Sequence, residues 1–85
     1  MNTNNKLINL IIRVDKKDSA FTYFILEAHE GLSFYSTLEH QEGDGFRDID
    51  IKGTVELKSE LLHVINFLQN QVKIDILKKE IIDDY

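Results

Sequence analysis

Apolar and polar residues alternate at the start of the chain. The even positions from 8 to 14 are all aliphatic, whereas the odd positions from 7 to 13 mix aliphatic and polar residues. Alternation places successive side chains on opposite sides of a strand, and the many β-branched residues favour a strand over a helix. We therefore predict a central strand over residues 7–14. One of its sides is fully apolar, and the other is half apolar and carries Leu7 and Ile11.

The next segment has the periodicity of an amphipathic helix. Four apolar residues follow the spacing i, i+3, i+4, i+7, which forms one stripe on a helix; they are Phe21, Phe24, Ile25 and Ala28. Gly31 follows at a position where glycine commonly ends a helix. On this helix Tyr23 and Leu26 fall away from the stripe, so we expect them to be exposed on a contact surface.

Two more alternating segments predict a β-hairpin. They cover residues 32–40 and 46–55, and a polar turn with two glycines over residues 41–45 connects them. Asp48 and Asp50 share one side of the second segment. That strand is therefore expected to have an acidic outer side, which discourages aggregation through the sheet edge.

A second helix and a short strand complete the pattern. The stripe of the helix consists of Leu57, Leu61, Val64, Ile65 and Leu68. Alternation over residues 72–77 predicts a short last strand, and residues 78–85 are expected to extend it, form a helical turn or fray. Residues 1–6 form a polar tail, and a chain of this length is expected to be a single domain, residues 1–85.

This order of elements predicts an α+β fold of the ferredoxin-like βαββαβ class. Right-handed connections place both helices on one face of a four-stranded antiparallel sheet, with the first and third strands in the centre. The other face of the sheet is expected to carry Leu7, Ile11, Tyr35 and Thr37. We expect that face to be apolar enough to bring two copies of the chain together.

Composition removes several classes of function. The chain of 85 residues has no cysteine, proline or tryptophan, which excludes disulfide scaffolds, cysteine-bound zinc or iron–sulfur sites and thiol enzymes. With 10 basic and 15 acidic residues the net charge is −5, and because the basic residues are scattered we expect no nucleic-acid binding. The start of the chain lacks the features of a signal peptide and no segment is long enough to span a membrane, so we expect a cytoplasmic protein without a membrane partner.

One cluster has the residue types of a metal site. His40, Glu42 and Asp44 would share one side of a continuous strand and offer three nitrogen or oxygen ligands to a divalent ion. The glycines at positions 43 and 45 interrupt the strand and favour a solvated turn instead. We predict no bound metal, no cofactor and no catalytic residue.

The corner after the first helix is predicted to be structural. Glu27 lies at the border of the apolar stripe and is expected to accept hydrogen bonds from backbone amides near Gly31. His29 lies two positions further on, and residues two apart on a helix do not face one another. Glu27 and His29 are therefore not expected to bind one ion together.

Parts of the chain resemble a family of small bacterial proteins, the domain of unknown function 4911 family. The resemblance rests on Val14–Lys17, Phe24–Ala28, Glu30–Leu32 and Ser36–Leu38. It covers about half of the chain and implies a bacterial, cytoplasmic protein without an established activity. The order of elements is also similar to that of ACT-type regulatory domains, which bind amino acids at dimer interfaces. Those domains carry a glycine after the first strand, where this chain has Asp15-Lys16-Lys17-Asp18.

These patterns predict a non-enzymatic interaction or regulatory module that acts as a homodimer or binds another protein. The expected contact residues are Ile11, Tyr23, Leu26 and Tyr35. One alternative is an ACT-like sensor of a small metabolite such as an amino acid. A second alternative is a metal-dependent enzyme that uses His40, Glu42 and Asp44.

Overall fold

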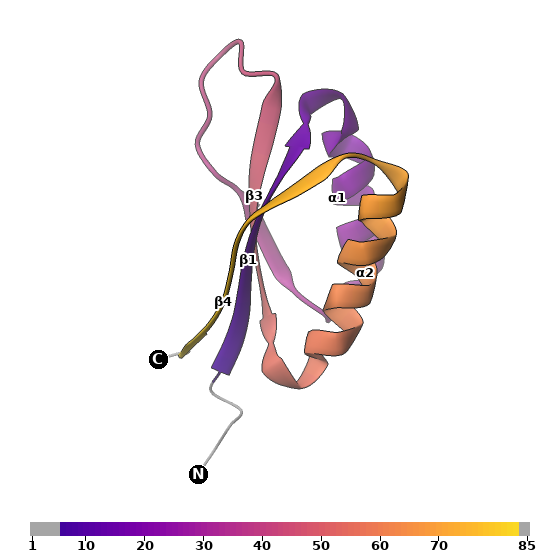
Figure 1. The fold of residues 1–85 in the computed structure, drawn as a ribbon, viewed down its shortest axis with the longest axis vertical. Helices are drawn as coiled ribbons and strands as arrows, with labels where there is room; N and C mark the ends of the chain where they lie inside the picture. The colour runs from indigo at the N-terminus through magenta and orange to yellow at the C-terminus, as the bar shows by residue number, and fades with distance from the viewer. Residues whose placement is uncertain (1–5, 84–85) are drawn as a thin grey trace.

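The computed structural model describes residues 6–83, which form a ferredoxin-like α+β fold. Two helices cover one face of a four-stranded antiparallel sheet (Figure 1). Short 3-10 turns, Lys16–Asp18 and Val55–Leu57, precede the two helices. In chain order the elements are β1 (Lys6–Asp15), α1 (Ser19–Ala28), β2 (Phe34–Thr37), β3 (Phe46–Thr54), α2 (Lys58–Gln71) and β4 (Ile74–Asp83).

The sheet has the strand order β2-β3-β1-β4, so the prediction that the first and third strands are central is confirmed. Strand β1 pairs with β3 on one side and with β4 on the other, antiparallel in both cases. The β1–β4 ladder contains a bulge: Ile12 lies opposite Ile76 whereas Ile11 lies opposite Lys78. Leu77 is therefore the extra residue of β4, and the ladder is regular beyond it.

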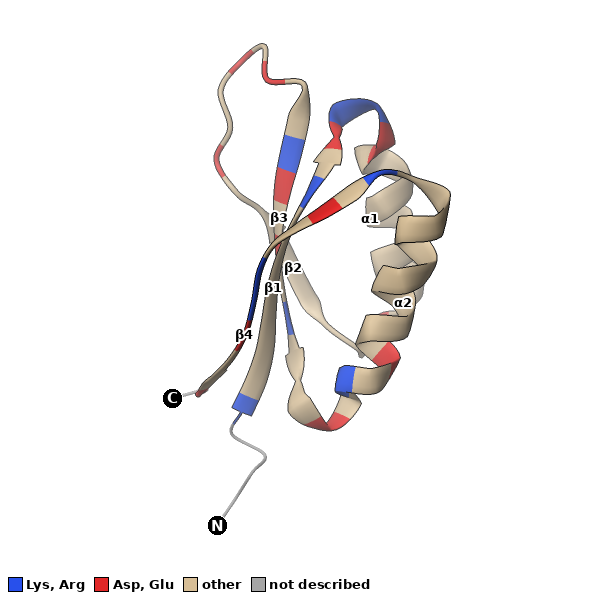
Figure 2. Ribbon diagram, viewed as in Figure 1, with Lys and Arg blue, Asp and Glu red and all other residues tan. Residues whose placement is uncertain are grey.

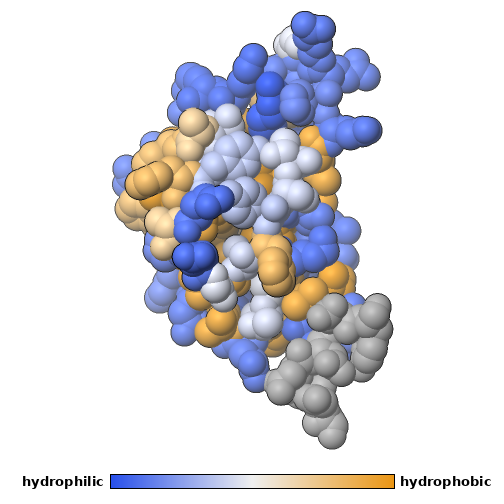
Figure 3. All heavy atoms as spheres, turned by 180° about the vertical axis from the view of Figure 1, so that it is seen from behind, coloured by the Kyte–Doolittle hydropathy of each residue, from blue (hydrophilic) through white to orange (hydrophobic). Residues whose placement is uncertain are grey.

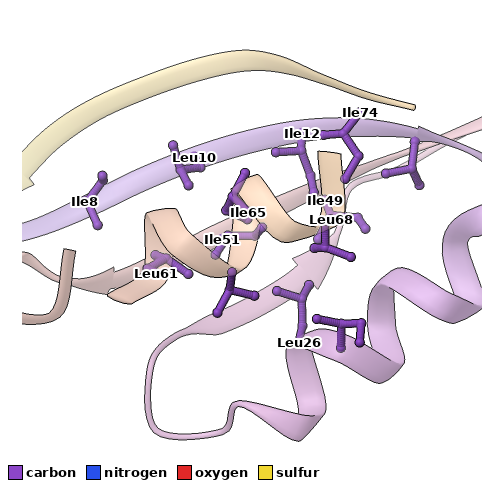
Figure 4. Packing of buried hydrophobic residues seen from close by; sticks show 13 residues of the cluster. Ile8, Leu10, Ile12, Leu26, Ile49, Ile51, Leu61, Ile65, Leu68 and Ile74 are labelled. Carbon is purple, nitrogen blue, oxygen red and sulfur yellow. The ribbon is translucent and has the colours of Figure 1, made fainter. Parts of the chain in front are cut away.

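The core lies between the sheet and the helices (Figure 4). The aliphatic side of β1 is buried in it, as predicted. Four of the five residues of the stripe predicted for the second helix, Leu61, Val64, Ile65 and Leu68, are buried as well, whereas Leu57 lies in the 3-10 turn before α2 and is half-buried. Leu61 and Ile65 of α2 are each 1% exposed. The largest fully buried side chains are Ile8, Leu10, Ile12, Ile49, Ile51, Leu61, Ile65, Leu68, Val14 and Thr22.

Helix α1 packs through a different stripe from the predicted one. Its buried residues are Thr22, Ile25 and Leu26, while Phe24 is 67% exposed. Leu26 is only 3% exposed, so the prediction that it lies on an outer contact surface is wrong. Neighbouring apolar residues of α1 form two overlapping stripes, and either could face the core. Thr22 can be buried because its hydroxyl is paired: Oγ1 donates to the Asp18 carbonyl at 2.9 Å.

The faces of β2 are also the reverse of the prediction. Tyr35 lies opposite Ile51, a fully buried residue on the helix side of the sheet, and Thr37 lies opposite Ile49. Directly paired residues share a face, so the placement of Tyr35 and Thr37 on the open face is wrong. Phe34 lies on the open face instead and is 76% exposed. Local alternation did not predict this register because the strand is only four residues long.

Both ends of the described segment belong to the sheet. The short last strand predicted over residues 72–77 exists, but it begins at Ile74 and continues to Asp83. Lys6, which the sequence pattern places in the polar tail, is the first residue of β1. The rest of that tail and the last two residues, 84–85, lie outside the described residues. Within residues 6–83, neither helix has the length and apolar character needed to cross a membrane.

Candidate functional site

Two tyrosines join helix α1 to the edge strand β2. The rings of Tyr23 and Tyr35 are stacked, with centroids 5.7 Å apart and an interplanar angle of 24°. The Tyr35 hydroxyl donates to Oε2 of Glu27 at 2.5 Å, and this bond raises the pKa of Tyr35. The Tyr23 hydroxyl forms a hydrogen bond with the Thr37 hydroxyl. The structure thus brings Tyr23, Tyr35 and Glu27 together, and both phenols are used within the chain.

The corner after α1 differs in part from the prediction. Gly31 has φ of +95°, a conformation that favours glycine, which agrees with its expected structural role. Glu27 accepts from Tyr35, and no backbone amide of the described residues donates to its carboxylate. The backbone of the corner instead closes on itself, with the Leu32 N–H donating to the His29 carbonyl at 3.2 Å.

The four predicted contact residues do not form one surface. Leu26 belongs to the core, and Tyr23 and Tyr35 lie on the helix side of the sheet. Ile11 lies on the open face, as predicted, opposite Asp50 of β3 and Lys78 of β4. A partner in contact with Ile11 is therefore separated from the two tyrosines by the thickness of the sheet.

The open face of the sheet carries two groups of paired polar and charged residues beside its apolar residues, so it is less apolar than expected. Arg13 of β1 holds Asp48 of β3 through two hydrogen bonds, Nε to Oδ1 at 2.8 Å and a terminal guanidinium nitrogen to Oδ2 at 2.9 Å. The guanidinium also lies 4.0 Å from the centroid of the Phe46 ring. Its hydrogen bond lowers the pKa of Asp48, and Asp48 in turn raises the pKa of Arg13. This cross-strand pair is charge-assisted and bidentate, a strong form of hydrogen bonding.

A second group on this face centres on Asp50. The buried Asn9 amide donates to Asp50 Oδ1 at 2.6 Å and to the Ile51 carbonyl at 3.1 Å. Lys52 donates to Asp50 Oδ2 at 2.8 Å. Burial alone would raise the pKa of Asp50, but the hydrogen bonds from Lys52 and Asn9 outweigh it, and the net shift is downward. Both carboxylates that the sequence placed on an acidic side are thus paired within the sheet.

The candidate metal ligands do not converge. His40 and Glu42 are exposed on the loop between β2 and β3. The Asp44 carboxylate accepts from the Gln41 N–H at 2.9 Å, and the Asp44 N–H donates to the Gln41 carbonyl at 3.0 Å. Asp44 therefore closes a turn. Within residues 6–83 no three histidine, aspartate or glutamate side chains are grouped so that they could hold a metal ion.

Exposed apolar side chains gather in places that the sequence did not suggest. Figure 3 shows hydrophobic patches separated by polar surface on one side of the molecule. Figure 2 shows that both helices carry charged residues almost only near their ends. The large exposed hydrophobic residues of the described segment are Phe21, Phe24, Phe34, Phe67, Ile76, Leu77 and Ile81. The last three belong to strand β4. The sequence pattern did not predict the apolar surface of β4 because the charged run Lys78-Lys79-Glu80 interrupts the alternation.

A groove of about 340 Å³ lies between the two helices. Its walls are formed by Ile25, His29, His63, Val64 and Phe67. The Nδ1 atom of His29 is hydrogen-bonded to the Ile25 carbonyl at 2.9 Å. Because a carbonyl can only accept, Nδ1 of His29 is the donor. The hydrogen bond to Ile25 leaves Nε2 of His29 unused.

Comparison of the chain with protein-family models, with curated proteins and with solved structures gives no match.

Proposed function

We propose that the protein is a non-enzymatic interaction module that acts as a homodimer. The observation that carries this proposal is the strand β4, an edge of the sheet on which Ile76, Leu77 and Ile81 are 40, 48 and 47% exposed. Edge strands present unpaired backbone groups, and natural proteins usually cover or shorten them when they also carry apolar side chains. Here the edge is ten residues long.

The engagement of the ionisable groups supports a binding role over catalysis. Asp48 is held by Arg13, and Asp50 is held by Asn9 and Lys52. Acid–base and nucleophilic groups in enzymes converge on one accessible reacting position. The carboxylates of Asp48 and Asp50 are instead hydrogen-bonded to neighbours within the sheet, which is consistent with a structural role.

Size also favours association. A domain of about this length buries only about 60% of the surface of its unfolded chain. Burial of further apolar surface stabilises by about 25 cal/mol per Å². Removing the exposed aliphatic groups of β4 from water in a dimer would therefore add to the stability of the fold.

Size-exclusion chromatography with light scattering tests this proposal. We expect a molar mass of twice the 9.9 kDa of the chain, declining toward one chain on dilution. A mass of one chain at every concentration would contradict the proposal. The cytoplasmic setting and the resemblance to the bacterial family stay predictions.

A second candidate function is small-molecule binding, as in an ACT-like sensor. The groove between α1 and α2 favours it, because its walls are mostly apolar and two imidazoles, those of His29 and His63, border it. A ligand that binds the folded state raises the melting temperature by mass action. A thermal-shift screen of amino acids and other metabolites is expected to yield a stabilising compound whose effect is lost in His63→Ala. A screen without any shift would count against this function.

A further inference from the structure

We infer that two copies of the chain pair through antiparallel β4 strands, with Ile81 opposite its own copy, and so join two four-stranded sheets into one. This inference rests on the proposed self-association and names the surface that produces it. The alternative surfaces for a dimer are the exposed phenylalanines of the helices and the charged open face of the sheet.

The outer edge of β4 is a suitable template for strand addition. Within residues 6–83, strand β4 pairs with β1 alone and is the end strand of the sheet (Figure 1). Beyond the bulge at Leu77, the ladder from Lys78 to Asp83 is regular. The unpaired N–H and C=O groups of this half of the strand repeat with the spacing that another strand requires.

The charges along β4 select one register. In an antiparallel pair related by a two-fold axis perpendicular to the sheet, each face stays continuous and one residue lies opposite its own copy. Centring the pair on Lys78, Lys79 or Glu80 places like charges directly opposite one another, which is unfavourable. Centring it on Ile81 places Ile81 against Ile81 and Lys79 against Asp83 of the second copy. Centring it on Ile82 places Ile81 against Asp83.

The side chains that would meet in this register are free to form the contacts it requires. Among residues 6–83, the side chain of Lys79 has no hydrogen-bonding or ion-pairing partner, although it is exposed on an edge strand. Asp83 accepts from Lys6 at 2.7 Å, and its side chain is still 60% exposed, so it can also accept from Lys79 of a second copy. Ile81 lies beside the buried Ile8 of β1 but keeps nearly half of its own surface in water. Pairing would cover the exposed Ile81 side chain and give the Lys79 ammonium group an ion-pair partner.

Single cysteines test the register directly, because the chain contains no cysteine of its own. Opposed residues in an antiparallel pair have Cα atoms about 4.5 to 5.5 Å apart, within the range that a disulfide spans. We expect Ile81→Cys to form a disulfide-linked dimer under mild oxidation. Two controls are matched in exposure: Leu77→Cys on the same strand, which does not face its own copy in this register, and Phe67→Cys on α2.

A charge reversal provides a second test that does not depend on disulfide chemistry. In Lys79→Glu, two lysine–aspartate pairs become two pairs of like charges, and we expect the dimer to dissociate about tenfold more readily. Lys58→Glu is the control, because it makes the same change in net charge at an exposed residue of α2. Sedimentation velocity gives the dissociation constants, and circular dichroism verifies that each variant is folded.

The outcomes separate the inference from the proposed function. If the wild-type chain is a dimer but only Phe67→Cys is cross-linked and Lys79→Glu associates like the wild type, the β4 pairing is overturned and the interaction module stands. If the wild-type chain is a monomer at all concentrations, both are overturned. Cross-linking of Ile81→Cys together with weakened association of Lys79→Glu supports both.

Discussion

Leu26 and Phe24 report which side of helix α1 packs on the sheet. Leu26 is 3% exposed and belongs to the hydrophobic core, whereas Phe24 is 67% exposed. Truncation of Leu26 to alanine removes buried methyl groups and leaves a cavity, which costs about 2 to 5 kcal/mol in proteins. Full burial of a phenylalanine contributes about 1.5 to 3 kcal/mol, so truncating a side chain that is one-third buried is expected to cost below about 1 kcal/mol.

Urea denaturation followed by circular dichroism measures both variants. We expect Leu26→Ala to lower the free energy of unfolding by at least about 2 kcal/mol, with an unchanged dependence on urea concentration. In a domain of this size that loss corresponds to a melting temperature lower by about 8 °C or more. If Phe24→Ala lost as much stability as Leu26→Ala, the packing of α1 through Leu26 would be refuted. The stripe predicted from periodicity, which includes Phe24, would then be the buried one.

Two further predictions concern a close backbone contact and an ion pair. A Cβ at Gly53 would lie 2.6 Å from the carbonyl oxygen of Leu32, so Gly53→Ala is expected to lower the stability by about 1 to 3 kcal/mol in thermal denaturation, whereas Gly45→Ala, with nothing within 4 Å of its Cβ, is expected to be neutral. The pKa of Asp48 is lowered by Arg13, so the stability from this pair is present above the unfolded pKa, about 3.9, and is lost as the pH falls through the lower folded value. Asp48→Asn is expected to lose less stability on acidification than the wild type, and equal losses in an acid titration of the unfolding free energy would contradict that role.

The sequence predicts the fold where each element has one apolar side. Strand β1 and helix α2 meet that condition, and their buried residues agree with the periodicity. Helix α1 does not, because apolar residues cover more than one side of it. Its contact with the sheet edge, the stacking of Tyr23 on Tyr35 of β2, joins separate elements and is not visible in the periodicity. Strand β4 extends through a charged segment because backbone pairing with β1 holds it there, which local propensity does not report.

The candidate site is less predictable because its contacts join distant parts of the chain. The partnership of Glu27 with Tyr35 depends on how α1 lies against β2, and no local spacing encodes it. The pair Arg13–Asp48 follows from the β1–β3 register, which becomes known only with the sheet. The turn that uses Asp44 was predicted from its glycines, and the same glycines argued correctly against a continuous strand at this loop.

Hydrogen exchange along strand β4 tests the central claim most directly. In an isolated chain, the outward-facing amides between Lys78 and Asp83 have no strand partner in the described part of the sheet and are expected to exchange rapidly. Self-association through this edge predicts that their protection rises with protein concentration, while that of the buried strand β1 changes little. Exchange rates in β4 that stay the same from dilute to concentrated solution, or concentration-dependent protection confined to the helices, would contradict it.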